Sequence, residues 1–186
     1  MAIILADGDF PSHPIPLQAL SKAHSIYCCD GAIRKLRTWI EARNEPQCHE
    51  IYVIGDGDSI SQNEWDNVQD RMQQKGYTVH RNCESEQDYN ALTKTSRFAF
   101  TRGERELIYL GATGLREDHT IGNISLMCYY SSGHAFNGEK PQMVRMISDY
   151  GTFTPIHKTT SFQSFARQQV SIFSMRYDTR YSTEGL

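Results

Sequence analysis

The sequence predicts an α/β protein with a mostly parallel sheet and flanking helices, followed by a small all-β region. Short apolar runs rich in β-forming residues alternate with longer segments in which apolar residues recur at three- and four-residue spacing. From about residue 140 the pattern changes to short alternating segments, with no helical segment between them. The first pattern is typical of strands joined by helices, which makes neighbouring strands parallel.

The expected elements follow from these patterns in chain order. Five runs are expected strands: AIILA (2–6), SIYCC (25–29), IYVIG (51–55), YTVH (77–80) and ELIYLG (106–111). Four segments have the period of amphipathic helices: AIRKLRTWIEAR, NEWDNVQDRMQQK, DYNALTKTSRFAF and the run after Asp118. The C-terminal region has QMVRMI, TFTPIH and QQVSIFSM as its short alternating segments. The predicted domains are residues 1–138 and 139–186.

Length, charge and cysteine content restrict the classes of function. A chain of 186 residues forms one domain, or one large and one small domain. The net charge of −3 and pI near 6.1 argue against nucleic acid or an anionic membrane as a partner. No apolar run could span a bilayer, and MAIILADGDF lacks the basic start of a signal peptide, so we expect a cytoplasmic protein. Five cysteines without a C-x-x-C pair indicate reduced core thiols rather than disulfides or structural zinc.

Acidic and glycine residues follow nearly every predicted strand. The strand ends read ADGD, CDG, GDGDS and GATG. Because parallel strands end at the same edge of a sheet, we expect these residues to lie together. Ligands of open parallel α/β sheets bind at that carboxyl edge.

Two acidic segments at this edge could hold a cation. Asp56 and Asp58 lie two positions apart in a glycine-flanked turn, which suits Mg²⁺ but is also an ordinary Asp-Gly turn. Glu84, Glu86 and Asp88 precede a helical segment, where acidic residues either cap the helix or serve a function. Carboxylates converging from both segments would repel each other, and a divalent cation would relieve the repulsion.

The remaining strand ends carry weaker signals. Asp30 and Gly31 follow the second strand, with Arg34 and Lys35 on the next helix; a solvated helical face is the favoured interpretation of Lys35. Asp7 and Asp9 are consistent with simple turn formers.

The stretch LGATGLREDHTIGN has two interpretations. It is either a strand-to-helix turn with a solvated first helical turn, or an anion site at a helix N-terminus. Arg116 could grip phosphate with its planar fork, while Asp118 and His119 could orient a ligand or a proton. The lysine loop GxxxxGK[ST], the nucleophile elbow GxSxG and a convincing GxGxxG are all absent. With the other strand ends, the stretch favours a magnesium-and-phosphate edge.

Four of these motifs resemble the thiamin pyrophosphokinase family. The matching segments are CDGA, GDGDSI, EQDYNALTK and GATGLREDHTIGN, in family order over residues 29–123. The resemblance implies a Rossmann-like sheet followed by a sandwich-like β domain. It also implies transfer of diphosphate from ATP to the hydroxyl of thiamin, giving thiamin diphosphate and AMP, with Mg²⁺ as cofactor. The implied assembly is a homodimer with the active site at the subunit interface.

The resemblance also assigns roles to individual residues. Magnesium would be held by Asp56, Asp58, Glu86 and Asp88. Gln87 and Asp58 would bind thiamin. ATP would contact Asp30, Gly31, Arg34, Gly111, Gly114, Arg116 and His119. The residues implied in catalysis are Asp56, Asp58, Asp88, Arg116 and Asp118.

This chain departs from the family pattern at two places. Asn90 and Ala91 stand where the family usually has an aspartate before the T-K helix, so one expected carboxylate is missing. The sequence ends at YSTEGL, where the family usually continues, so we expect an incomplete β domain. Two other functions stay open at this point: a metal-dependent phosphoesterase, and a non-catalytic binder of nucleotide or thiamin.

Overall fold

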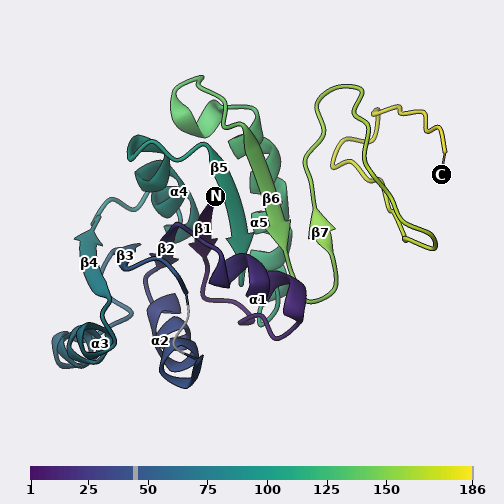
Figure 1. Cartoon of the computed structure of the whole chain (residues 1–186). Coiled ribbons are helices and arrows are strands. Elements are labelled where there is room, and N and C mark those ends of the chain that lie inside the picture. Colours follow the sequence, from purple (N-terminus) through teal and green to yellow (C-terminus); the bar gives the residue numbers. More distant parts are fainter. Residues whose placement is uncertain (44–45, 186) are drawn as a thin grey trace. The chain divides into compact units, whose positions relative to one another are not determined.

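The computed structural model describes residues 1–43 and 46–185, and Leu186, the last residue of the predicted second domain, lies outside them. The chain divides into two units, residues 1–155 and 156–186. Figure 1 shows the chain with its elements labelled.

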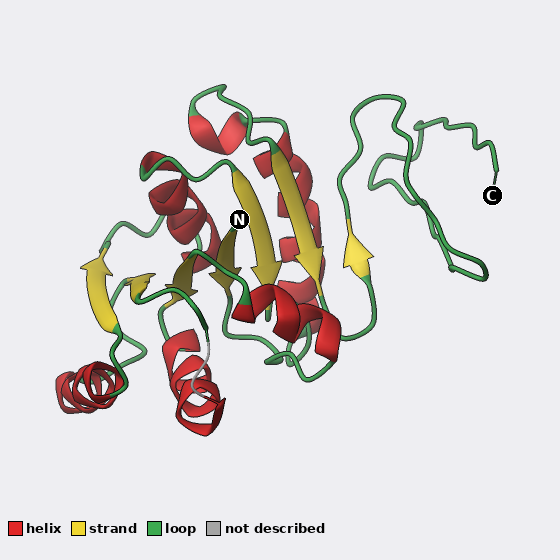
Figure 2. Ribbon diagram, viewed as in Figure 1, coloured by secondary structure: helices red, strands yellow, loops and turns green. Residues whose placement is uncertain are grey.

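The first unit is built on a sheet with strand order β4-β3-β2-β1-β5-β6-β7. All neighbouring pairs from β4 to β6 are parallel, and only β7 is antiparallel to its neighbour. Figure 2 shows β7 running opposite to β6. The strands are β1 (Ala2–Leu5), β2 (Ser25–Cys29), β3 (Glu50–Gly55), β4 (Thr78–Cys83), β5 (Glu106–Leu110), β6 (Met143–Ile147) and β7 (Thr152–Phe153).

Helices cover both faces of this sheet, as predicted from the alternating pattern. The helices are α1 (Pro14–Ser21), α2 (Ala32–Arg43), α3 (Gln62–Gln74), α4 (Ala91–Thr101) and α5 (Glu117–Ser131), with a 3₁₀ turn η1 (His134–Phe136). Alternate strand residues point to opposite faces. Ile3 packs in one core cluster with residues of α1, α2 and α3, whereas Ile4 packs in the other with residues of α4 and α5. Figure 1 shows α1 and α5 on opposite sides of the sheet.

The predicted fold class of a mostly parallel sheet with flanking helices is confirmed, with differences in single elements. Helix α1 was not predicted, because its PIPLQALS sequence has two prolines and little helical period; His13 caps it, and its first proline is the first helical residue. QMVRMI, assigned from sequence to the C-terminal region, forms β6 of the main sheet, next to β5. QQVSIFSM forms no strand in the described chain.

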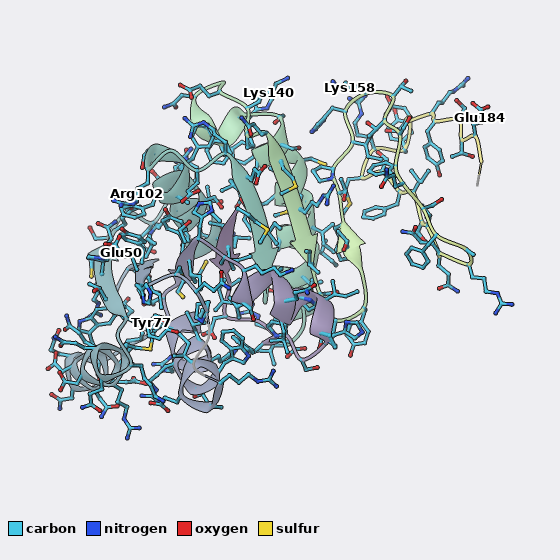
Figure 3. All side chains as sticks on the ribbon, in the orientation of Figure 1. Glu50, Tyr77, Arg102, Lys140, Lys158 and Glu184 are labelled. Atoms are coloured by element: carbon cyan, nitrogen blue, oxygen red, sulfur yellow. The ribbon has the colours of Figure 1, made fainter. Side chains whose placement is uncertain are left out.

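The second unit, residues 156–186, has no packed interior in its described part. Its large apolar side chains are exposed, as in Phe165 (72%) and Tyr177 (103%). Figure 3 shows the side chains of this segment, where Lys158 and Glu184 are labelled. Helices able to cross a membrane are absent from residues 1–43 and 46–185, since none is both long and apolar enough.

Candidate functional site

The candidate site lies at the carboxyl edge of the sheet. Because β1 to β6 are parallel, the loops that follow them all emerge at this edge. The chain runs from β1 to β2, β3 and β4 on one side, then returns to place β5 on the other side of β1. Such a reversal of strand order is where open α/β sheets bind ligands. The residues predicted for the site all follow these strands or begin the next helix: Asp30, Gly31, Arg34, Asp56, Asp58, Glu86, Gln87, Asp88, Gly111, Gly114, Arg116, Asp118 and His119.

A cavity of about 330 Å³ opens at this reversal. Its walls come from the loops after β1, β5 and β6, including Asp9, Phe10, Gly114 and Asp149. A concave space with polar and aromatic walls at this position is the ordinary form of a small-molecule site.

The loops after β1 and β5 are held together by backbone hydrogen bonds. Gly8 N–H donates to the Gly111 carbonyl at 2.7 Å, and Asp9 N–H donates to the Thr113 carbonyl at 2.9 Å. Gly114 has φ +80°, and a Cβ there would lie 1.9 Å from Oδ2 of Asp9. The glycine is therefore required both by its backbone conformation and by the close approach of this carboxylate.

Arg116 and Asp118 hold each other in a two-point ion pair. Arg116 Nε lies 3.1 Å from Oδ1 of Asp118, and the second guanidinium nitrogen lies 2.5 Å from Oδ2. Both side chains are nearly two-thirds exposed. The hydrogen bonds from Arg116 lower the pKa of Asp118. The guanidinium is thus displayed at the start of α5 with its fork on a carboxylate, the geometry that also suits phosphate.

The Asp56–Asp58 loop adopts the predicted tight turn. Oδ1 of Asp56 accepts a hydrogen bond from the Asp58 N–H at 3.2 Å, and both side chains are exposed. Asp30 is buried, has φ +33°, and accepts from Ser59 N–H at 3.2 Å. Gly55 leaves room for it, because a Cβ there would lie 2.6 Å from the Asp30 Cβ. Asp30 therefore supports the loop that carries the two exposed aspartates.

The two basic residues of α2 also contact loops at this edge. Arg34 makes a two-point ion pair with Glu64, at 2.5 and 3.0 Å, and donates to the Ser59 carbonyl. Lys35 Nζ lies 2.8 Å from Oδ1 of Asp7 and donates to the carbonyls of Asp7 and Gly8 at 2.9 and 2.7 Å. The interpretation of Lys35 as a solvated helical residue is therefore wrong, since its ammonium anchors the loop after β1.

The acidic segment after β4 lies against the Asp56–Asp58 loop. Glu84 N–H donates to the Gly55 carbonyl at 2.7 Å, joining the two loops at their bases. Glu86 accepts from the Asp88 N–H through its carboxylate. The helix that follows is capped by Asn90, whose Oδ1 accepts from Thr93 N–H at 2.9 Å. Because Asn90 serves as the cap, the acidic residues before it are not needed for that purpose.

The residue types of the two acidic loops suit a metal ion, although their side chains do not form a complete coordination site. Carboxylate oxygens on two joined loops are ligands that Mg²⁺ prefers. Across residues 1–43 and 46–185, no three His, Cys, Asp or Glu side chains are grouped closely enough to hold a metal ion. Holding Mg²⁺ would require the exposed side chains of the two loops to turn toward each other.

Sequence reasoning missed three residues that build this edge. Lys94 and Arg81 donate to backbone carbonyls of the two acidic loops. Asp149, after β6, accepts from Ser12 N–H and His13 N–H at 3.0 Å each. The sequence does contain a signal for Asp149, because SDYG follows a strand with an aspartate and a glycine, as the other strand ends do. That segment had been assigned to the C-terminal region. Lys94 ends the EQDYNALTK segment that resembles the family, but no role was assigned to it. Nothing in the sequence distinguishes Arg81 from a surface residue.

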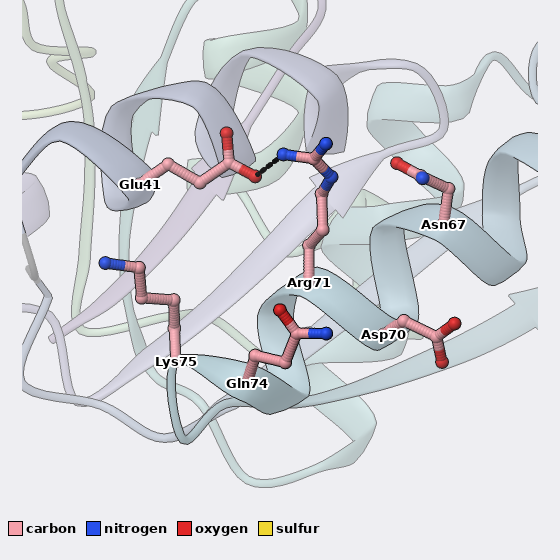
Figure 4. A pocket seen from close by; sticks show the side chains of 6 residues that line it. All are labelled: Glu41, Asn67, Asp70, Arg71, Gln74 and Lys75. Carbon is pink, nitrogen blue, oxygen red and sulfur yellow. Dashed lines mark hydrogen bonds and ion pairs between the residues drawn. The ribbon is translucent and has the colours of Figure 1, made fainter.

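A second cavity, of about 560 Å³, lies between the C-terminal halves of α2 and α3 (Figure 4). Glu41 and Arg71 face each other across it at 3.2 Å. Both helices start at the carboxyl edge and run back along the sheet, so their ends lie at the opposite edge from the strand-end motifs. This second cavity is therefore separate from the candidate site.

The sheet order and its polar carboxyl edge place the molecule among the doubly wound α/β proteins, which bind ligands at such an edge. The family profile described as "Thiamin pyrophosphokinase, catalytic domain" matches residues 17–136, and that of the "substrate-binding domain" matches residues 151–186. The chain therefore belongs to the thiamin pyrophosphokinase family. A search among curated proteins gave no match.

Solved structures of similar fold carry the same family name. A thiamin pyrophosphokinase family protein from Enterococcus faecalis is 21% identical with a TM-score of 0.52, over 80% of this chain and 61% of that one. Yeast thiamin pyrophosphokinase is 14% identical with a TM-score of 0.54, over 79% and 58%. Thiamin pyrophosphokinase from Candida albicans is 19% identical with a TM-score of 0.53, over 79% and 58%. This chain thus spans about three-fifths of the length of these relatives.

Proposed function

We propose that this chain transfers diphosphate from ATP to the hydroxyl of thiamin, giving thiamin diphosphate and AMP. Its family membership supports the proposal. The observation that carries it is the convergence of the family's motifs from separate strands on one edge of the sheet, beside the reversal of strand order. A phosphoesterase would need more nitrogen ligands at this edge than the aspartate loops offer.

The proposed reaction makes modest demands on the protein. The hydroxyl oxygen of thiamin attacks the β-phosphorus of ATP, the bond from that phosphorus to the oxygen bridging the α-phosphate breaks, and AMP leaves. The hydroxyl proton is released to solvent or to a nearby base. Positioning of the two substrates and neutralisation of phosphate charge supply most of the rate enhancement in such transfers.

In this proposal Asp56, Asp58, Glu86 and Asp88 hold Mg²⁺, directly or through water. The bound ion would neutralise charge on the phosphates of ATP. The protein's own part is to keep the two loops joined, through the 2.7 Å bond between Glu84 N–H and the Gly55 carbonyl. The exposed carboxylates then lie on neighbouring loops in reach of one ligand.

The nucleotide would lie over the start of α5. Arg116 would exchange the carboxylate of Asp118 for phosphate oxygens, since both present the same two-point acceptor. Gly111 and Gly114 would shape the pocket, with His119 at its rim. Arg34 and Asp30 would act on the site through the Ser59 loop that both contact, with Gly31 leaving room for Asp7 and Arg34. Gln87, exposed on the acidic loop, would lie near thiamin together with Asp58.

The proposed assembly is a cytoplasmic homodimer with the active site at the subunit interface. Exposed aromatic side chains in residues 156–186 support this, because a stable protein seldom leaves so many uncovered: Phe162, Phe165, Phe173, Tyr177 and Tyr181. Sedimentation equilibrium tests it, with a dimer mass expected and a monomer at all concentrations contradicting it.

A direct assay tests the activity. The protein is mixed with ATP, Mg²⁺ and thiamin, and AMP and thiamin diphosphate are quantified by chromatography. Equal amounts of both products are expected. Binding of ATP or thiamin in calorimetry without product would instead select a non-catalytic binder, and phosphate release without thiamin would select a phosphoesterase.

A further inference from the structure

Lys94 is a buried lysine beneath the acidic loop of residues 84–88. It lies in the first turn of α4, and only 4% of its surface is exposed. Its ammonium donates to the carbonyl oxygen of Glu84 at 3.0 Å and to that of Glu86. Among the described residues, no carboxylate lies within ion-pair distance of it, so the ammonium is held by backbone carbonyls of the acidic loop.

A buried ammonium stabilises the conformation of the chain segment that supplies its hydrogen-bond acceptors. Taking a lysine charge out of water is costly unless hydrogen-bond acceptors replace the water. If the loop moved away, Lys94 would lose both acceptors while its helix stayed packed in the core. The ammonium therefore favours the one loop conformation in which the carbonyls of Glu84 and Glu86 point inward, and in which the acidic side chains point outward.

Arg81 has the corresponding role for the neighbouring loop. It lies on β4, and its guanidinium donates to the carbonyls of Gly57 at 3.2 Å and Ile60 at 3.1 Å. It also lies over the ring of Trp65, 5.1 Å from the centroid. Each acidic loop thus has its own basic side chain bound to its backbone rather than to its carboxylates.

We propose that Lys94 is a positioning residue that holds the acidic loop 84–88 in the conformation that binds the metal–nucleotide complex. Because it is buried, it does not contact the substrate. The consequence for the reaction rests on the proposed function, whereas the effect on the loop does not. Removing the charge should loosen residues 84–88, weaken the binding of Mg²⁺ and ATP, and leave the loop 56–60 in place.

Hydrogen exchange of backbone amides, measured without ligand, tests the loop directly. Lys94→Met keeps the length of the side chain and removes its charge. We expect amides of residues 84–90 to exchange about tenfold faster, with residues 56–60 close to wild type. Arg81→Met is the matched control, with the opposite pattern expected. Unchanged exchange in residues 84–90, or equal acceleration throughout the chain, would overturn the proposal.

Kinetics supply the second readout. For Lys94→Met we expect the Mg²⁺ concentration for half-maximal rate and the KM for ATP to rise about tenfold, with the KM for thiamin near wild type. A fall in kcat alone would overturn the positioning role. An inactive wild-type protein would refute the proposed function and leave the exchange result to decide the loop. Both measurements are repeated with Lys94→Gln. If neither variant folds, Lys94 is required for folding and the positioning role is overturned.

Discussion

The backbone N–H of Glu84 donates a 2.7 Å hydrogen bond to the carbonyl oxygen of Gly55. This bond continues the pairing of β3 with β4 by one step beyond the last strand residues, Gly55 and Cys83. It joins the bases of two loops whose acidic side chains are 26 or more residues apart in sequence. The proposed metal site depends on that junction, because it places the separate carboxylates on neighbouring loops.

Asp56→Asn is expected to abolish turnover with little change in stability. Asn retains an oxygen that can accept the hydrogen bond from Asp58 N–H, so the turn survives while the charge is lost. We expect kcat to fall about 100-fold or more, and the free energy of unfolding to change by about 0.5 kcal/mol or less. Asp70→Asn, the same change on α3 away from the site, is the control. Wild-type rates in Asp56→Asn would remove this residue from the mechanism.

Gly114→Ala is expected to destabilise the protein more than other substitutions at left-handed glycines. The new Cβ would meet Oδ2 of Asp9 at 1.9 Å, whereas Gly76, with φ +86°, has open space around it. We expect a loss of about 3 kcal/mol for Gly114→Ala and about 1 kcal/mol for Gly76→Ala in urea unfolding. Adding Asp9→Ala should recover part of the larger loss. Equal losses for both glycines would contradict the packing of Asp9 on Gly114.

Arg116→Lys is expected to raise the KM for ATP about tenfold, because lysine keeps the charge but cannot bind two phosphate oxygens with a planar fork. Stability should be nearly unchanged, since the pair with Asp118 is exposed. The chain offers a matched control in Arg176, which pairs with Asp178 in the same two-point geometry at 3.0 and 2.7 Å. A KM for ATP that rises equally in Arg176→Lys would show that the effect is not specific to the site.

Asp149→Asn is expected to destabilise the protein in a pH-dependent way. Although burial opposes ionisation, hydrogen bonds from Ser12 and His13 lower the pKa of Asp149 below its usual value. A lowered pKa in the folded state means that the carboxylate stabilises the fold above the unfolded pKa, near 4, and loses this contribution as the pH falls through the folded pKa. We expect a loss of about 1–2 kcal/mol at pH 7 that shrinks as the pH is lowered below about 4. A difference independent of pH would contradict this role.

Much of the fold could be predicted from the sequence because strands buried on both faces are continuous apolar runs. IYVIG and ELIYLG are two such runs, and the observed strands β3 and β5 match them within a residue at each end. Prediction from sequence fails where the local pattern of a segment does not reveal its place in the tertiary structure. QMVRMI alternates like a strand with one solvated face, yet it pairs in parallel with β5. Cys28, Cys29 and Cys48 are buried thiols as expected, whereas Cys83 and Cys128 are exposed at positions their short neighbourhoods do not reveal.

The candidate site, too, could be predicted only in part from the sequence. The rule that parallel strands end at one edge was enough to bring the strand-end motifs together, with Asp56 and Asp58 exposed there. The rule does not tell which charged groups face a ligand and which hold the scaffold. Arg34 binds Glu64, Asp30 binds the Ser59 N–H and Lys94 binds carbonyls. These contacts depend on distances between helices that no local pattern encodes.

The central claim is that carboxylates of the two joined loops bind one divalent ion against the phosphates of ATP. Its most direct test is a crystal structure with Mn²⁺ and an ATP analogue whose α,β-bridging oxygen is replaced by methylene, in which anomalous scattering locates the metal. We predict a Mn²⁺ ion between residues 55–59 and 84–88, with a phosphate oxygen and at least one carboxylate from each loop as ligands. A metal–nucleotide complex bound elsewhere, or ligated by only one of the loops, would contradict the account.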